Sequence, residues 1–118
     1  MDLEVTVVGE GPASIARVTG EIDLMSAPTF QERLLGAAAE TDALVVDLTD
    51  VSYLDSSALA SLHRVLLSCR DRGTELRVVT GTEGVSKRLL GITGLDEVMR
   101  ASDTVAEALA TLTTVTEN

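Results

Sequence analysis

The sequence predicts an α/β fold: one domain with a mixed sheet of four to five strands and about four helices. Three observations favour this class. Segments typical of strands alternate with segments typical of helices along the chain. The run ALVVDL at 43–48 is almost continuously apolar, as expected for a strand covered on both faces. Elsewhere, apolar residues recur every three to four positions, which is the spacing of a helix with one buried face.

The first two elements are predicted to be paired strands. They cover residues 5–8 and 14–19, and Gly-Glu-Gly-Pro at 9–12 has the composition of the turn between them. A helix is expected over 27–39. Ser26 is its predicted N-cap, and Pro28 fits the first turn, where a missing N–H group costs nothing.

The second half of the chain continues the alternation after the strand at 43–48. A long helix is expected over 57–72, and Gly73 is the residue that stops it. A strand at 76–80 and a short helix at 84–90 follow, and residues 98–100 read as a brief edge strand.

The last predicted element is a helix over about 103–113, capped by Ser102 or Asp103. Val105, Leu109 and Leu112 give it an apolar stripe at helical spacing. The domain therefore spans residues 1–118 with a core at about 3–112, and 113–118 is expected to be a frayed tail.

Composition narrows the class of protein. A chain of 118 residues is long enough for one core, and with aromatic residues at only 2% and no Trp that core must be aliphatic. The shortage of aromatic residues and the net charge of −10 both argue against a nucleic-acid partner. The single cysteine excludes an intrachain disulfide. No apolar run approaches a membrane span and no signal peptide is evident, so we expect no membrane association and a cytoplasmic location. We also expect a monomer or weak dimer.

The negative charge is unevenly distributed. Residues 1–63 carry 11 acids and two bases, whereas residues 64–118 carry 8 acids and 7 bases. A partner that docks on the first half is expected to present basic groups, which would speed the encounter. The simpler interpretation, equally open on the sequence, is that the acidity keeps a small protein in solution.

Two short motifs carry a family resemblance. The segment at 44–62 reads as a buried strand ending in Asp-Leu at 47–48, a short loop, and then Asp-Ser-Ser-Ala-Leu at 55–59, which opens a helix. Gly-Glu-Ile-Asp at 20–23 follows the second strand. Together, in this order, they resemble the signature of the STAS family, specifically the bacterial anti-sigma factor antagonists. The resemblance covers roughly residues 3–112 and implies a single STAS-like domain.

Helical periodicity distinguishes the two serines. On a wheel of about 100° per residue, Ser57 falls with Ser61 and Arg64 opposite the apolar face, which predicts that this side meets solvent. Ser56 falls nearer the buried flank. The wheel therefore favours Ser57 as the accessible hydroxyl, and the resemblance independently implies that the second serine is phosphorylated. The simplest alternative is that 55–57 merely caps a helix.

A phosphate on Ser57 would suit a switch. It adds about −1.5 to −2 charges at a helix N-terminus, which the fold should tolerate, so it would act by repelling a partner. The resemblance implies that this partner is an anti-sigma factor that is itself a serine kinase. The unphosphorylated protein would bind it and release a sigma factor, and a serine phosphatase would restore Ser57.

The predicted site is thus a binding and modification site. The resemblance adds Asp23, in the loop before the first helix, although a solvated loop carboxylate remains the alternative. His63 is the only histidine, and its spacing from Ser57 places the two on different sides of a helix, so we expect no catalytic residue, metal or cofactor. The predicted partner-binding residues are Asp23, Asp55, Ser56, Ser57, Ala58, Ser61 and Arg64.

Two other functions stay open. A constitutive STAS scaffold or accessory subunit, of a stress-signalling complex or a lipid transporter, would use the same fold without phosphorylation. An enzyme or nucleotide-binding domain would need a nucleophile with its base, or a phosphate-binding loop, and the sequence offers neither.

Overall fold

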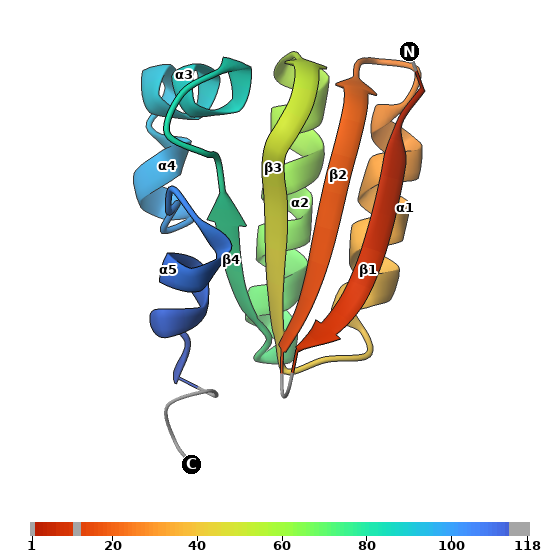
Figure 1. Cartoon of the computed structure of the whole chain (residues 1–118). Coiled ribbons are helices and arrows are strands. Elements are labelled where there is room, and N and C mark those ends of the chain that lie inside the picture. The colour runs from red at the N-terminus through yellow and green to blue at the C-terminus, as the bar shows by residue number, and fades with distance from the viewer. Residues whose placement is uncertain (1, 11–12, 114–118) are drawn as a thin grey trace.

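Four strands form one mixed sheet, in which the strands lie side by side in chain order (Figure 1). The computed structural model describes residues 2–10 and 13–113. Neighbouring strands β1 and β2 are antiparallel, whereas β2 and β3, and β3 and β4, are parallel. The strands are β1 (Glu4–Glu10), β2 (Ala13–Ile22), β3 (Ala43–Leu54) and β4 (Glu75–Val79).

The described residues also form five helices, and the two longest are the crossovers between the parallel strands. Helix α1 joins β2 to β3, and α2 joins β3 to β4, so both lie on the same face of the sheet (Figure 1). The helices are α1 (Ala27–Ala38), α2 (Ser56–Arg72), α3 (Val85–Thr93), α4 (Leu95–Val98) and α5 (Val105–Ala110). The α/β class, the mixed sheet and the strand count are as predicted.

The core lies mainly between the sheet and this helical layer. Alternate residues of β3 point to opposite faces, so Leu44 and Val46 face α1 and α2, while Val45 faces α5. Phe30 of α1 and Leu62 of α2 are almost fully buried in the larger cluster. As predicted, aliphatic side chains dominate this core.

The second face of the sheet is only partly covered. A smaller cluster packs α5 against β3 and β4, and Arg77 of β4 fixes the end of that helix through Nε, which donates to the Thr111 hydroxyl at 2.9 Å. Over β1 and β2 the same face is open, and Val8 and Arg17 are exposed there.

Several predicted boundaries were wrong. Strand β3 does not end at residue 48 but continues to Leu54, because Val51 and Leu54 are buried and keep the strand against the core. The predicted edge strand at 98–100 is instead the end of α4 and its C-cap, because Leu95 and buried Met99 turn this segment into the core. The outer edge of β4 is met by Ser102, whose N–H donates to the Val78 carbonyl at 2.9 Å.

The caps of two helices also differ from the predictions. Ser26 occupies the N-cap position of α1, but its side chain makes no capping bond. Helix α5 is capped by Thr104, not by Ser102 or Asp103: the Thr104 hydroxyl accepts from the Glu107 N–H at 3.1 Å. The helix ends at Ala110, before the predicted residue 113. The tail expected at 113–118 lies, apart from Thr113, outside the described residues.

Candidate partner-binding site at the start of helix α2

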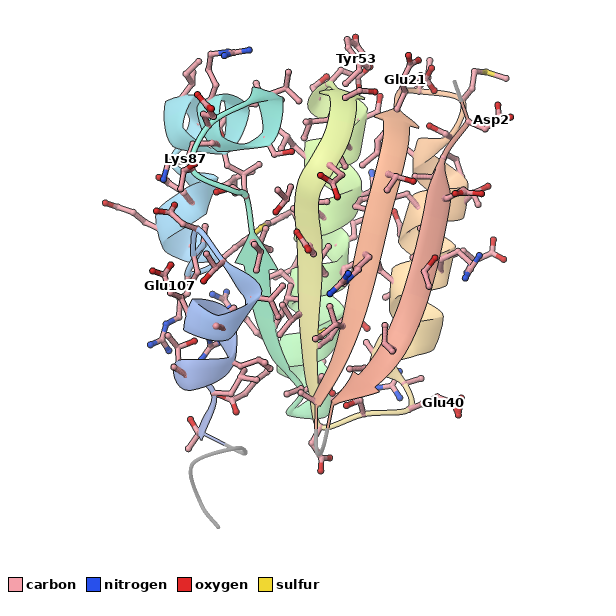
Figure 2. The ribbon with its side chains drawn as sticks, viewed as in Figure 1. Asp2, Glu21, Glu40, Tyr53, Lys87 and Glu107 are labelled. Carbon is pink, nitrogen blue, oxygen red and sulfur yellow. The ribbon has the colours of Figure 1, made fainter. Side chains whose placement is uncertain are left out.

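The two predicted motifs meet at the end of the sheet where the parallel strands β2 and β3 terminate. Strands β2 and β3 run parallel and end opposite each other, with Ile22 paired to Leu54. The loop after β2 and the start of α2 therefore lie together, at the edge where ligands of parallel sheets commonly bind. Figure 2 shows this edge at the top, marked by Glu21 and Tyr53.

Asp55 is the residue that starts α2. Its backbone is extended, and its Oδ1 accepts a hydrogen bond from the Ser57 N–H at 2.9 Å. The Asp55 carbonyl accepts from the N–H groups of Ala58 and Leu59. Capping is thus performed by the carboxylate alone, and no hydrogen bond found among the described residues uses the Ser56 or Ser57 hydroxyl. Both hydroxyls are left for other chemistry.

The exposure of the two serines reverses the prediction from the helical wheel. Ser56 is exposed and Ser57 is half-buried. Ser61, predicted to face solvent, is only 2% exposed, and its hydroxyl lies 3.4 Å from the Ala27 carbonyl. The physical reason is that α1 packs beside α2 on the same sheet face, so the side of α2 that looks away from its apolar stripe is covered by a neighbouring helix.

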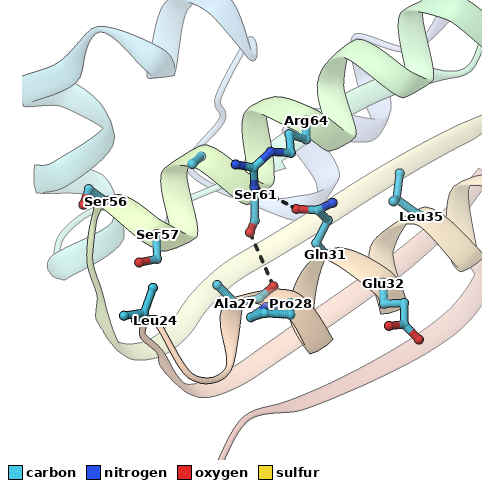
Figure 3. Close-up of a pocket in the computed structure, with 11 residues that line it drawn as sticks. Leu24, Ala27, Pro28, Gln31, Glu32, Leu35, Ser56, Ser57, Ser61 and Arg64 are labelled. Carbon is cyan, nitrogen blue, oxygen red and sulfur yellow. Dashed lines mark hydrogen bonds between the residues drawn. The ribbon is translucent and has the colours of Figure 1, made fainter.

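A groove runs between α1 and α2 and ends at the two serines (Figure 3). Its volume is about 580 Å³. Across it, Arg64 of α2 donates from Nη1 to Oε1 of Gln31 on α1 at 3.1 Å. The groove is lined by Leu24, Ala27, Pro28, Gln31, Glu32, Leu35, Ser56, Ser57, Ala60, Ser61 and Arg64.

Four of the seven predicted binding residues line this groove: Ser56, Ser57, Ser61 and Arg64. Asp55 adjoins it as the cap. Ala58 is 2% exposed and packs into the core, and Ser61 is equally buried although it borders the groove, so neither side chain offers a partner the contact that the sequence predicted. His63 is exposed.

Two exposed apolar side chains in the loop between β2 and α1 were missed. Leu24 is 73% exposed and lines the groove, and Met25 beside it is 86% exposed. Exposed apolar groups next to a groove are typical of docking sites. The available signal was the pair of apolar residues directly after the Gly-Glu-Ile-Asp motif, in a loop where polar residues are usual.

Asp23 holds this loop in shape. Its Oδ1 accepts from the N–H groups of Met25 and Ser26, each at 3.0 Å, and from the Ser26 hydroxyl at 3.1 Å. The Ser26 hydroxyl also lies 3.0 Å from the Glu21 carbonyl, which explains why it does not cap α1. Asp23 is therefore a structural residue of the loop that presents Leu24 and Met25, and not a merely solvated carboxylate.

These bonds give a pH dependence that can be measured. The Ser26 N–H, followed by the Ser26 hydroxyl and the Met25 N–H, lowers the pKa of the Asp23 carboxyl below its usual value. A lowered pKa stabilises the folded state at neutral pH, and this contribution is lost as the pH falls through the folded-state pKa. Asp23→Asn should therefore lower the Tm at pH 7 and lose this effect in acid. An equal Tm difference at all pH values would contradict a role for the charge.

The described part of the chain offers no candidate for a metal site or a membrane-spanning helix. In residues 2–10 and 13–113, no three His, Cys, Asp or Glu side chains gather in a set able to hold a metal ion. No helix there has the length and apolar character needed to cross a bilayer.

The sequence matches a family model described as the STAS domain over residues 4–108. It is 32% identical to the anti-sigma-F factor antagonist RsfA of Mycobacterium tuberculosis over 111 residues, which cover 92% of this chain and 86% of that protein. It is also 37% identical to the anti-sigma-B factor antagonist of Listeria monocytogenes, over 76% of this chain and 79% of that one.

Solved structures agree with this match. A crystal structure of an anti-sigma factor antagonist from Mycobacterium paratuberculosis superposes with a TM-score of 0.78 at 27% identity, over 92% of each chain. The unphosphorylated form of the antagonist SpoIIAA shares the fold, with a TM-score of 0.70 at 14% identity over 92% of this chain and 93% of that one.

Proposed function

The chain belongs to the STAS domain family, and from this membership we propose that it is an anti-sigma factor antagonist switched by phosphorylation of Ser57. In its unphosphorylated form it binds an anti-sigma factor that is also a serine kinase, and this binding releases a sigma factor. The protein is then a binding partner and a substrate of the kinase, not an enzyme. This role places it in the cytoplasm, where RNA polymerase works.

One observation supports Ser57 more than any other. Its side chain lies at the end of the groove between α1 and α2, while its own N–H is already bonded by the Asp55 carboxylate. The hydroxyl therefore has no capping role to lose when it is modified. Ser56 is more exposed and its hydroxyl is equally free, and we place the phosphate on Ser57 because the family resemblance implies the second serine of the pair.

The charges around Ser57 favour a switch that acts on binding. Asp55 is the adjacent cap, Glu32 lines the groove, and Arg64 is the single basic residue that lines it. A phosphate would add about −1.5 to −2 charges beside these carboxylates. Because the modified group lies at the surface of a helix start, the fold can keep its shape while a partner on the groove is repelled.

The apolar part of the surface supports the same partner interface. Leu24 and Met25 stand out from a loop that Asp23 fixes, and Leu24 lines the groove together with Ser56 and Ser57. A partner that covers Leu24 would also cover the Ser57 hydroxyl. Phosphorylation by the bound kinase and release of the product then follow from one contact surface, and a serine phosphatase resets it.

The test is phosphorylation by the kinase that the protein captures. Wild type, Ser57→Ala and Ser56→Ala are immobilised, incubated with lysate of the source cell, and probed for bound proteins and, after ATP is added, for phosphosites by mass spectrometry. We expect wild type and both variants to capture one small ATP-binding kinase. Phosphate should appear on Ser57 in wild type and in Ser56→Ala, and on no serine of the pair in Ser57→Ala.

Two outcomes would contradict the proposal. Phosphate on Ser56 with Ser57 unmodified would move the switch by one residue. Equal capture of a different partner by wild type and Ser57→Ala, with no phosphate found, would favour a constitutive scaffold or accessory subunit instead.

A further inference from the structure

The outer edge of β1 presents free backbone groups. The Val5 carbonyl accepts from Arg33 Nη2 of α1 at 2.7 Å, so Val5 turns its polar groups away from β2. In an antiparallel pair, alternate residues bond to the neighbouring strand. The outward set is therefore Val5, Val7 and Gly9, while Thr6 and Val8 bond to β2. The backbone N–H and C=O groups of Val7 and Gly9 have no hydrogen-bond partner among the described residues. Such an edge is a template for another strand.

Nothing within one copy of the chain explains the two glycines that lie beside this edge. Gly36 is in the interior of α1, and Gly9 is in β1. A Cβ built on either one would meet nothing within 4 Å, and neither has a positive φ. Glycine inside a helix or strand costs stability relative to alanine, and it often marks a place where another backbone approaches.

The side chains around this edge carry charges of both signs, with Glu32 and Glu40 beside Arg33. Val7, 41% exposed, lines a shallow groove with Arg33, Gly36 and Glu40. Gly9 lines the adjoining depression, again with Glu40. Arg33 and Glu40 thus lie at opposite ends of one strip of surface, with Val7 and Gly36 between them. Figure 2 shows Glu40 at the lower end of α1.

We propose that this edge binds a second copy of the same chain. The two β1 strands pair antiparallel about a two-fold axis at Val7, so that Val5 of one copy lies opposite Gly9 of the other. Arg33, which reaches over Val5, then enters the space left by the missing side chain of Gly9 and meets Glu40 of the second copy. By symmetry this ion pair occurs twice, and Gly36 lets the two α1 helices approach.

The proposal does not depend on the function of Ser57. On α1, Gln31 and Leu35 face the groove toward α2, whereas Arg33 and Gly36 face the edge of the sheet. A dimer through β1 therefore leaves both Ser57 grooves open to partners. Failure of the phosphorylation experiment would not affect the dimer proposal, and failure of the dimer proposal would not affect the proposed role of Ser57.

The first test is a charge exchange, read by sedimentation equilibrium of the full chain from micromolar to millimolar concentrations. Glu40→Arg places two like charges together at each end of the interface and should weaken dimerisation at least about tenfold. The same variant changes the net charge from −10 to −8, which would favour non-specific association. The double variant Arg33→Glu/Glu40→Arg restores a net charge of −10 and should restore the dimer.

The second test locates the interface. In wild type, hydrogen exchange at the Val7 and Gly9 N–H groups should slow as the protein concentration rises, whereas exchange in Glu40→Arg should not change. A wild-type protein that stays monomeric at millimolar concentration would overturn the proposal. So would a dimer that Glu40→Arg leaves intact, or one whose protection appears away from β1.

Discussion

Leu24→Asp is expected to weaken binding of the captured kinase about 30-fold, or about 2 kcal/mol, and to leave the fold intact. Leu24 is 73% exposed, so its replacement removes no core packing. It lines the groove that ends at Ser57, where a partner would bury it. A charge at this position must then be desolvated in the complex, whereas in the free protein it stays in water. Titration calorimetry with the purified kinase measures the change.

The chain offers a matched control for this change. Ile92 on α3 is 75% exposed and does not line the groove, so Ile92→Asp introduces the same charge at an equally exposed apolar side chain. We expect it to bind the kinase like wild type. If both variants lose affinity equally, net charge governs the binding and the groove is not the docking surface.

Phe30→Ala is expected to lower the free energy of unfolding by about 3–5 kcal/mol. Phe30 is the only phenylalanine in the chain, and its side chain is 1% exposed between α1 and the sheet. Since a domain of this size has about 5–15 kcal/mol of total stability, the loss is large. Urea denaturation measures it.

Phe30→Leu separates the filled volume from the aromatic ring at the same position. It keeps an apolar branched side chain and should cost no more than about 1.5 kcal/mol. Equal losses for Ala and Leu would mean that the aromatic ring itself, and not the filled volume, stabilises α1.

The alternation of strands and helices could be predicted because each element buries one clear set of residues. The apolar run at 43–48 marks the central strand, whose Leu44, Val45 and Val46 are fully buried. The continuation of β3 to Leu54 could not be predicted as easily. Its exposed residues Thr49 and Asp50 resemble a loop, and only the packing of the two later apolar residues in the folded chain keeps it extended.

The sequence placed the candidate residues at the start of α2, beside the groove, but it did not predict which of their side chains are exposed. A helical wheel orders side chains around one axis, so it placed Ser57, Ser61 and Arg64 on one side correctly. It contains no information about a second helix, and α1 covers that side where it packs on α2. Ser61 is buried for this reason, and the shared side of the two helices is a groove rather than an open face.

The N-cap of α5, by contrast, could have been predicted from the sequence and was not. Thr104 and Glu107 have the spacing of a capping box, in which a threonine hydroxyl accepts from an N–H three residues later. The structure contains that bond, and Glu107 in turn accepts from the Asp103 N–H at 3.1 Å. The apolar stripe of α5 suggested a longer helix because Leu112 is buried beyond its end.

The position of β3 between β2 and β4 has a consequence for how the chain is made. Both of its neighbours are parallel to it, and each is reached through a helical crossover, so β3 cannot pair locally with either. During synthesis, β3 has a neighbouring strand on each side only after Val79 has left the ribosome. Until then the most apolar segment of the sequence lacks a partner on one side, and the start of α2 is attached to a strand that is not yet fixed. Synthesis of β4 therefore completes a site whose residues are all encoded before it.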